Sequence, residues 1–207
     1  MPRVDDYQMA FQIAADKLRA MDAEEVAQAA GARLTPEGLQ LNFVGLECAV
    51  SLDPVAVSGS DGQEVPLTDR VLILHYLTQA DGRPMTGQWI AYRQIPGAQT
   101  YHPVFYQRAI APFKAGFGPR PELLAQLTAD LPARPGQGGD AAVVIQALPR
   151  TPVLLQVWQA DEDFPAEANI LFDESISGYL TAEDVAWLAG RVVYPLVGRA
   201  KAQGGDK

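Results

Sequence analysis

Acidic side chains gather between residues 161 and 184, where the chain reads DEDFPAEANILFDESISGYLTAED. Asp161 and Asp163 directly follow a predicted strand, and because side chains alternate along an extended chain, both could face one hard cation. Asp173 ends the next predicted strand, where it could join that site or work with Asp163 as a general acid and base. A solvated, charged turn explains the same residues. We favour the turn, and we expect no metal ion and no other cofactor.

Histidine and cysteine offer few further candidates for catalysis. His75 lies in the apolar segment VLILHYL, where a hydrogen-bonded core histidine is the expected role and a catalytic histidine is the alternative. Cys48 is the single cysteine, and we expect it to be a small core residue. Thr181 can cap a helix whose first turn holds Glu183 and Asp184, so we assign these two acids to the helix start.

Arginine and aromatic residues form a third candidate set, suited to binding an acidic molecule. Tyr101, Phe105 and Arg108 are spaced so that they share one face of a predicted helix. Arg93 and Trp89 share one face of a predicted strand. An arginine can bind a carboxylate or phosphate while aromatic rings bury the rest of the ligand. The predicted ligand-binding residues are Trp89, Arg93, Tyr101, Phe105, Arg108, Asp140 and Trp158.

Internal ion pairs are the alternative role for Arg93 and Arg108, with Asp140, Asp163 or Asp173 as partners. In both cases we expect the two arginines to lie near the acidic turn at the edge of the sheet. The reason is that an unpaired guanidinium group is costly to bury among apolar neighbours.

Composition limits the kind of protein that this chain can be. With 207 residues, 48% of them hydrophobic, the chain can bury the core of one domain. We place this domain at residues 1–200, with a helical N-terminal arm at about 4–30. We expect residues 201–207 to form a disordered tail. The net charge of -9 disfavours nucleic acids and anionic membrane surfaces. The apolar runs are too short to cross a bilayer, so we expect a cytoplasmic protein.

The hydrophobic pattern changes along the chain in a way that predicts an α+β fold, with a mixed or antiparallel sheet packed by several helices. An alternating pattern from Gly38 to about residue 59 predicts a small antiparallel meander. Helices are expected at 5–19, 22–31, 67–80, 99–115, 121–130 and 181–200. Further strands are expected at 87–95, 141–148, 152–160 and 168–172.

Several short motifs occur in a characteristic order: TGQWIAYR at 86–93, LPRTPV at 148–153, DEDFP at 161–165 and YLTAED at 179–184. In this order they resemble an uncharacterised bacterial and archaeal domain family, DUF3786. The resemblance implies that some relatives carry a four-cysteine iron–sulfur module, like that of corrinoid proteins, in organisms with anaerobic one-carbon metabolism. Nothing in this sequence matches that module, and no catalytic residue transfers from the family.

Three functions remain open at this point. The leading hypothesis is an accessory or ligand-binding domain that binds a small anionic molecule or a partner protein, linked to anaerobic one-carbon or corrinoid metabolism. The first alternative is a metal-assisted acid/base enzyme that uses Asp163 and Asp173. The second alternative is a protein–protein interaction module. Nucleic acids and membranes are not expected partners.

Overall fold

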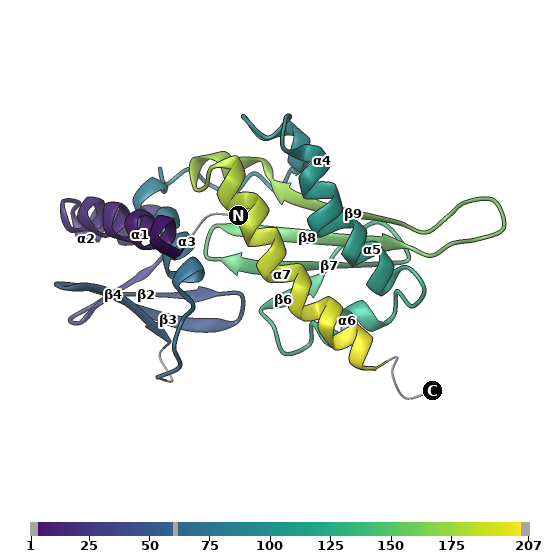
Figure 1. Ribbon diagram of the computed structural model, residues 1–207, viewed down its shortest axis with the longest axis horizontal. Coiled ribbons are helices and arrows are strands. Elements are labelled where there is room, and N and C mark those ends of the chain that lie inside the picture. The colour runs from purple at the N-terminus through teal and green to yellow at the C-terminus, as the bar shows by residue number, and fades with distance from the viewer. Residues whose placement is uncertain (1–3, 60–61, 204–207) are drawn as a thin grey trace.

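Two antiparallel sheets and the helices packed on them make up the fold (Figure 1). The computed structural model describes residues 4–59 and 62–203. The predicted α+β class is confirmed, and buried side chains from both sheets and from the helices between them form one hydrophobic core. No helix in the described ranges is both long and apolar enough to span a membrane.

The first half of the chain forms two helices and the predicted meander. Helix α1 covers Val4–Arg19 and α2 covers Ala23–Ala30. Asp22 caps α2 by accepting hydrogen bonds from the backbone N–H groups of Glu24 and Glu25, and Gly31 ends the helix in the left-handed conformation, as predicted. The meander has the strand order β1-β2-β3-β4. Its strands are Arg33–Thr35, Gly38–Phe43, Leu46–Leu52 and Val55–Gly59.

Helix α3, Leu67–Gln79, connects the two halves of the molecule. It contacts α1, α2 and α7 (Ala182–Ala202), which explains why its sequence is apolar on nearly every side. The hydroxyl group of Tyr76 in this helix donates to the backbone oxygen of Ala30 and accepts from the backbone N–H of Arg150. One buried side chain therefore ties the end of α2 to the turn between β7 (Ala141–Leu148) and β8 (Thr151–Trp158).

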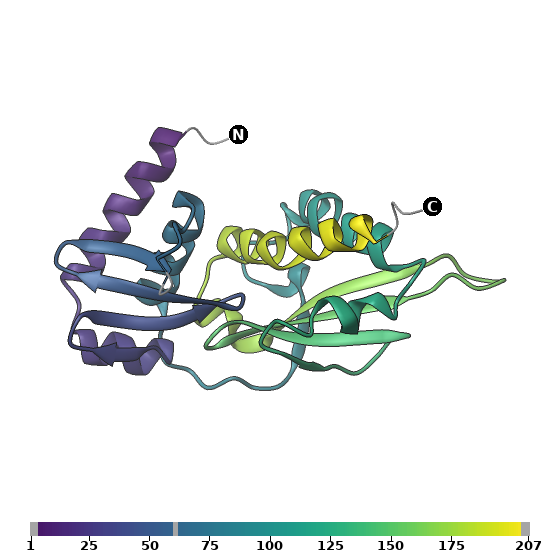
Figure 2. The same ribbon diagram turned by 90° about the horizontal axis from the view of Figure 1, so that it is seen from below.

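The second sheet has the order β5-β9-β8-β7-β6, and every neighbouring pair is antiparallel. In that order its strands are Trp89–Ala91, Glu167–Asp173, Thr151–Trp158, Ala141–Leu148 and Ala133–Pro135. Helix α7 and the helical segment 102–117 lie together over one face of this sheet (Figure 2). The helices of this half are α4, His102–Phe105; α5, Ala111–Phe117; α6, Leu123–Leu127; and α7, Ala182–Ala202.

Some predicted boundaries are wrong. The strand expected at 87–95 ends at Ala91, because a 3-10 turn, Tyr92–Gln94, follows and the side chain of Gln94 accepts a hydrogen bond from the backbone N–H of Ala91. The last helix extends to Ala202 and so enters the tail that was expected to be disordered. Residues 204–207 of that tail lie outside the described ranges.

Asp173, at the end of β9, anchors the segment that leads into β5. Its buried carboxylate accepts hydrogen bonds from the backbone N–H groups of Thr86, Gly87 and Ser175, at 3.0, 2.7 and 2.9 Å. Burial by itself would raise the pKa of this carboxyl group, but the hydrogen bonds from Ser175, Thr86 and Gly87 outweigh it and lower the pKa below its usual value. Asp173 is therefore an ionised structural residue.

The substitution Asp173→Asn should lower the free energy of unfolding at pH 7 by about 2 to 3 kcal/mol, because charged hydrogen bonds are lost and buried donors are left poorly paired. This contribution is complete above the pKa of the unfolded carboxyl, about 3.9, and is lost as pH falls below that value toward the lower pKa of the folded state. Urea unfolding at pH 7 and pH 3 measures both effects.

The matched control is Asp163→Asn, because Asp163 is exposed in the hairpin between β8 and β9. We expect its effect to stay within about 0.5 kcal/mol. Equal effects of the two substitutions would contradict the anchoring role of Asp173.

Candidate functional site

A cavity of about 380 Å³ lies where α3, α7 and the segment 101–109 meet, and Tyr7 of α1 forms part of its wall. We call it the aromatic cavity. Its most informative lining residues are Tyr7, Asp69, Phe105, Arg108, Trp187 and Arg191. Apolar rings and a few charged groups thus surround one hollow of the size that small molecules occupy in proteins.

Helix α7 supplies one wall of this cavity. Thr181 caps the helix, so its first turn starts at a defined point. Glu183, Trp187 and Tyr194 follow at intervals of four and seven residues, and these spacings place all three on one helical face. That face lines the aromatic cavity.

A π-helical turn shapes the opposite wall. Residues Tyr106–Ile110 form this turn, and the backbone N–H of Ala111 bonds to the oxygen of Tyr106 instead of continuing the α-helical pattern. Pro112 follows directly, and a proline cannot donate to the preceding turn and collides with it in a regular α-helix. The wider turn therefore accommodates Pro112, and its residues Arg108 and Ala109 line the cavity.

Two contacts hold side chains on this wall in place. The ring of Phe105 stacks on the ring of Tyr92, with centroids 4.0 Å apart and an angle of 11° between the planes. The guanidinium group of Arg108 donates to the hydroxyl oxygen of Tyr101 at 3.3 Å. Among the described residues no carboxylate forms an ion pair with Arg108. Arg108 is therefore a cation that a ligand can use.

Asp69 and Arg191, which also line the aromatic cavity, form an ion pair. The Nη2 of Arg191 is 2.9 Å from Oδ2 of Asp69, whose side chain is 3% exposed, while that of Arg191 is 40% exposed. Burial raises the pKa of the Asp69 carboxyl above its usual value, and the Arg191 and Trp187 side chains offset only part of that rise. Asp69 lies in the first turn of α3, where the helix dipole favours a carboxylate.

A neighbouring hollow of about 390 Å³ shares Tyr7, Thr68, Glu183 and Trp187 with the aromatic cavity. We call it the histidine cavity, because His75 lines it. The Nδ1 of His75 is 2.7 Å from Oδ1 of Asp184. Asp184 Oδ2 in turn accepts hydrogen bonds from Thr181 Oγ1 at 2.7 Å and Gln79 Nε2 at 3.3 Å.

Asp184 therefore does more than cap α7. The capping box that the sequence predicts is present, and the same carboxylate also orients His75. Burial would raise the pKa of Asp184, but its bonds to His75, Thr181 and Gln79 hold that pKa below the usual value. The hydrogen bond to Asp184 in turn raises the pKa of His75, although burial opposes the rise. His75 is thus half-buried and paired, not enclosed in the core.

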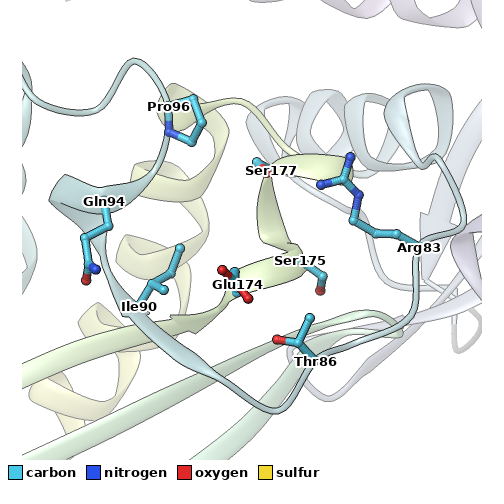
Figure 3. A pocket seen from close by; sticks show the side chains of 8 residues that line it. All are labelled: Arg83, Thr86, Ile90, Gln94, Pro96, Glu174, Ser175 and Ser177. Carbon is cyan, nitrogen blue, oxygen red and sulfur yellow. The ribbon is translucent and has the colours of Figure 1, made fainter.

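A third cavity, of about 490 Å³, lies next to the 3-10 turn that follows β9 (Figure 3). Its wall combines the segment 83–96 with the 3-10 turn Glu174–Gly178. Arg83 already forms an ion pair with Asp81 at 2.5 Å, and Glu174 adds a negative charge. The buried Oγ of Ser175 has no hydrogen-bond partner in the described ranges. This cavity thus offers a polar wall without a free cation, and suits an anion less well than the aromatic cavity.

The structure brings together part of the predicted ligand-binding set. Tyr101, Phe105 and Arg108 line the aromatic cavity, as their helical spacing indicated. The remaining four residues do not line it: Trp89, Arg93, Asp140 and Trp158. Trp89 lies in the edge strand β5, and Asp140 and Trp158 lie at the hairpin end of the sheet.

The predicted ion pairs of Arg93 and Arg108 are absent from the described residues, and both arginines are exposed. Arg93 lies outside the strand that was expected to carry it, because the 3-10 turn after Ala91 directs the chain away from the sheet. Asp140 instead accepts a hydrogen bond from the backbone N–H of Gln159. Neither arginine therefore forms an ion pair with the described acids of the turn between residues 161 and 173.

The pairing of Asp163 with Asp173 is also wrong. Asp163 lies in the hairpin that precedes β9, which projects from the sheet in Figure 1, and Asp173 ends that strand. The length of β9 separates them by roughly 20 Å. Asp161 accepts hydrogen bonds from the backbone N–H groups of Asp163 and Phe164, so these acids form the charged turn that we favoured. No described group of three or more His, Cys, Asp or Glu side chains could hold a metal ion.

Sequence reasoning missed Asp69, Trp187 and Arg191. A signal for each was present. Asp69 is the one acid in a helix with a long apolar run, which implies a buried partner. Trp187 and Arg191 are four residues apart in α7, a spacing that places an aromatic ring and a cation on one face.

The substitution Asp69→Asn should raise the free energy of unfolding at pH 7, because asparagine imitates the protonated carboxyl that burial favours. A carboxyl whose folded pKa is raised destabilises the protein as pH rises from its unfolded pKa, about 3.9, toward the folded value. The gain should therefore vanish below about pH 3.9, where the carboxyl is protonated in both states. Urea unfolding across pH 3 to 7 measures it.

The matched control is Asp130→Asn, since Asp130 is an exposed carboxylate whose pKa is lowered by Arg199. It should produce no gain in stability at pH 7. A less stable Asp69→Asn variant at pH 7 would show that the ion pair with Arg191 outweighs burial.

Comparison with known proteins gives one family and no individual relative. The family model described as Domain of unknown function (DUF3786) matches residues 22–194. Searches of the curated proteins and of the solved structures gave no significant match. The matched range includes the chain from the N-cap of α2 to Tyr194 in α7, and so most of the two cavities and both sheets. The chain therefore belongs to the DUF3786 family of domains of unknown function.

Proposed function

We propose that the protein is a ligand-binding domain whose aromatic cavity holds a small molecule with an acidic group on an apolar, ring-containing body. One observation carries the proposal. Arg108 lines a cavity with Phe105 and Trp187, and no described carboxylate neutralises it. A carboxylate or phosphate group of a ligand is the partner that such an arginine recognises.

Arg108 is the group in this cavity that can bind an acidic ligand, because the other charged groups are paired or screened. Asp69 and Arg191 neutralise each other. Glu183 lines the cavity at its exposed side, where water screens its charge. The chain as a whole carries a net charge of -9, so its long-range field does not attract anions. An acidic ligand must therefore be recognised by direct contact with Arg108 and Tyr101.

The apolar part of the ligand has a matching surface. Phe105 is buried and fixed by its stacking on Tyr92, so it offers a preformed wall. Trp187 and Tyr194 are 38% and 52% exposed, and a bound ring would bury more of both. Rings contribute large contact areas at a small cost in conformational entropy, which suits them to this task.

The resemblance of the sequence to the DUF3786 family extends the proposal to cellular context. The domain would be an accessory to anaerobic one-carbon or corrinoid metabolism. No residue described here carries that part of the proposal. Cys48 is buried in the core between β2 and β4 and is paired in register with Leu41 and Gly59. The binding proposal is independent of this context.

Benzoate should raise the melting temperature of the wild-type protein more than benzamide does, because only benzoate carries the negative charge that Arg108 binds. Ligands that bind the folded state alone stabilise it in proportion to their occupancy. Arg108→Gln should weaken benzoate binding about tenfold or more, which corresponds to the loss of one charged hydrogen-bonded contact. Differential scanning fluorimetry and calorimetric titration provide the two measurements.

The matched control is Arg93→Gln, which removes the same charge from an exposed position outside the cavity. It should leave the benzoate effect unchanged. Equal stabilisation by benzoate and benzamide, or equal losses in the two arginine variants, would show that the aromatic cavity is not an anion site.

A further inference from the structure

We propose that the protein is also an ester hydrolase, in which His75 acts as the general base that activates water against an ester bound across the two cavities. This inference rests on the proposed function, because the acidic end of the ester would be bound by Arg108. It adds a reaction, a substrate class and a catalytic residue.

The hydrogen bonds around His75 leave one ring nitrogen available for catalysis. The pKa of Asp184 is lowered, so its carboxylate is ionised at neutral pH and can only accept. The Nδ1 atom of His75, 2.7 Å from that carboxylate, must therefore carry the proton. The Nε2 atom of the neutral ring then carries the lone pair that can accept a proton.

The carboxylate that orients His75 is itself held in place. Thr181 donates to Asp184 through both its hydroxyl and its backbone N–H, at 2.7 and 3.2 Å, and Gln79 donates at 3.3 Å. A base that is oriented by a carboxylate, which is oriented in turn by further donors, is the arrangement found around catalytic histidines. The pair therefore has the rigidity that proton transfer requires.

The charges around His75 favour the form that has taken up a proton. Asp184 and Glu183 of α7 raise its pKa, while burial and Lys17 of α1 lower it, and the net change is a rise. Asp6 of α1 lines the same cavity and adds a third carboxylate. Asp184 and Glu183 thus stabilise the imidazolium ion that forms when His75 removes a proton from water.

Water can reach the His75 ring, and a substrate can extend from the histidine cavity into the aromatic cavity, which Arg108 lines. The His75 side chain is 29% exposed at the wall of the histidine cavity. Tyr7, Thr68, Glu183 and Trp187 line both cavities, so the two hollows adjoin and one molecule can extend from one into the other. A suitable substrate therefore has an acidic group at one end of a ring and an ester at the other.

The wall shared by the two cavities carries groups that could stabilise the reacting carbonyl. Thr68 and Tyr7 line both cavities, and each has a hydroxyl group that can donate a hydrogen bond. A donor near the carbonyl oxygen stabilises the negative charge that develops on it during attack.

The reaction consumes one water molecule and needs no other reactant. The water oxygen forms a bond to the acyl carbon while Nε2 of His75 takes one of its protons. The tetrahedral intermediate then breaks its bond to the leaving oxygen, and the imidazolium returns the proton to that oxygen. The products are a carboxylic acid, which ionises in solution, and an alcohol or phenol, and His75 is neutral again.

The probe is 4-acetoxybenzoate, which carries a carboxylate, one ring and an ester, and which yields 4-hydroxybenzoate and acetate. The wild-type protein should hydrolyse this ester faster than buffer does. The absorbance of the phenol product measures the rate. His75→Gln should lower kcat by about 100-fold or more, the usual contribution of a general base. Arg108→Gln should mainly raise KM.

His102→Gln is the matched control, because His102 lines none of the three cavities and its loss should leave the rate unchanged. The wild-type rate should fall as pH falls through the raised pKa of His75. Asp184→Asn should move this midpoint to lower pH, since it removes the carboxylate that raises the pKa. A purely structural role of Asp184 would leave the midpoint in place.

Two results separate this inference from the binding proposal. If 4-acetoxybenzoate raises the melting temperature through Arg108 but is not hydrolysed faster than in buffer, the catalytic role of His75 is refuted and the binding site stands. If it neither binds nor reacts, both proposals fail. Hydrolysis that persists in folded His75→Gln protein would also overturn the catalytic role.

Discussion

The carboxylate of Asp184 is the contact on which the geometry of the whole site depends. It completes the capping box at the start of α7 and, through His75 and Gln79, holds that helix against α3. Both cavities lie between these two helices. Because a buried charge is costly unless all of its partners are present, this one group fixes the position of α7 more tightly than apolar packing would.

Irregular helices surround the aromatic cavity. The π-helical turn at Tyr106–Ile110 lies on one side, and Pro195 lies inside α7 on the other. Proline has no N–H group, so the backbone oxygen of Arg191 lacks the partner that a regular helix would give it. π-Helical turns are rare and frequently occur at functional sites. Their position here agrees with a cavity that is maintained for binding and not only left by imperfect packing.

Local sequence signals predicted much of this fold. Asp22 and Gly31 define α2 because caps act within a few residues, and Tyr101 and Phe105 share a wall because they lie one helical turn apart. The failures concern positions that depend on distant segments. Asp163 and Asp173 are close in sequence, but a complete strand separates them.

The Asp69–Arg191 and His75–Asp184 pairs also depend on segments that are distant in sequence, and the sequence did not predict them. Each joins α3 to α7, and only the packing of these two distant helices determines which acid meets which base. The capping role of Asp184 could be inferred from Thr181 three residues earlier, whereas its bond to His75 could not.

The pairing of β5 with β9 has a consequence for the order in which the chain folds. β5 follows α3, yet among the described strands it pairs with β9, which comes much later in the chain. Contacts between distant segments form late, because closing the intervening loop costs entropy before any contact repays it. The segment around Thr86 and Gly87 gains its anchor only when Asp173 arrives with β9. The meander can therefore form early during synthesis, whereas the edge of the second sheet must wait until β9 has left the ribosome.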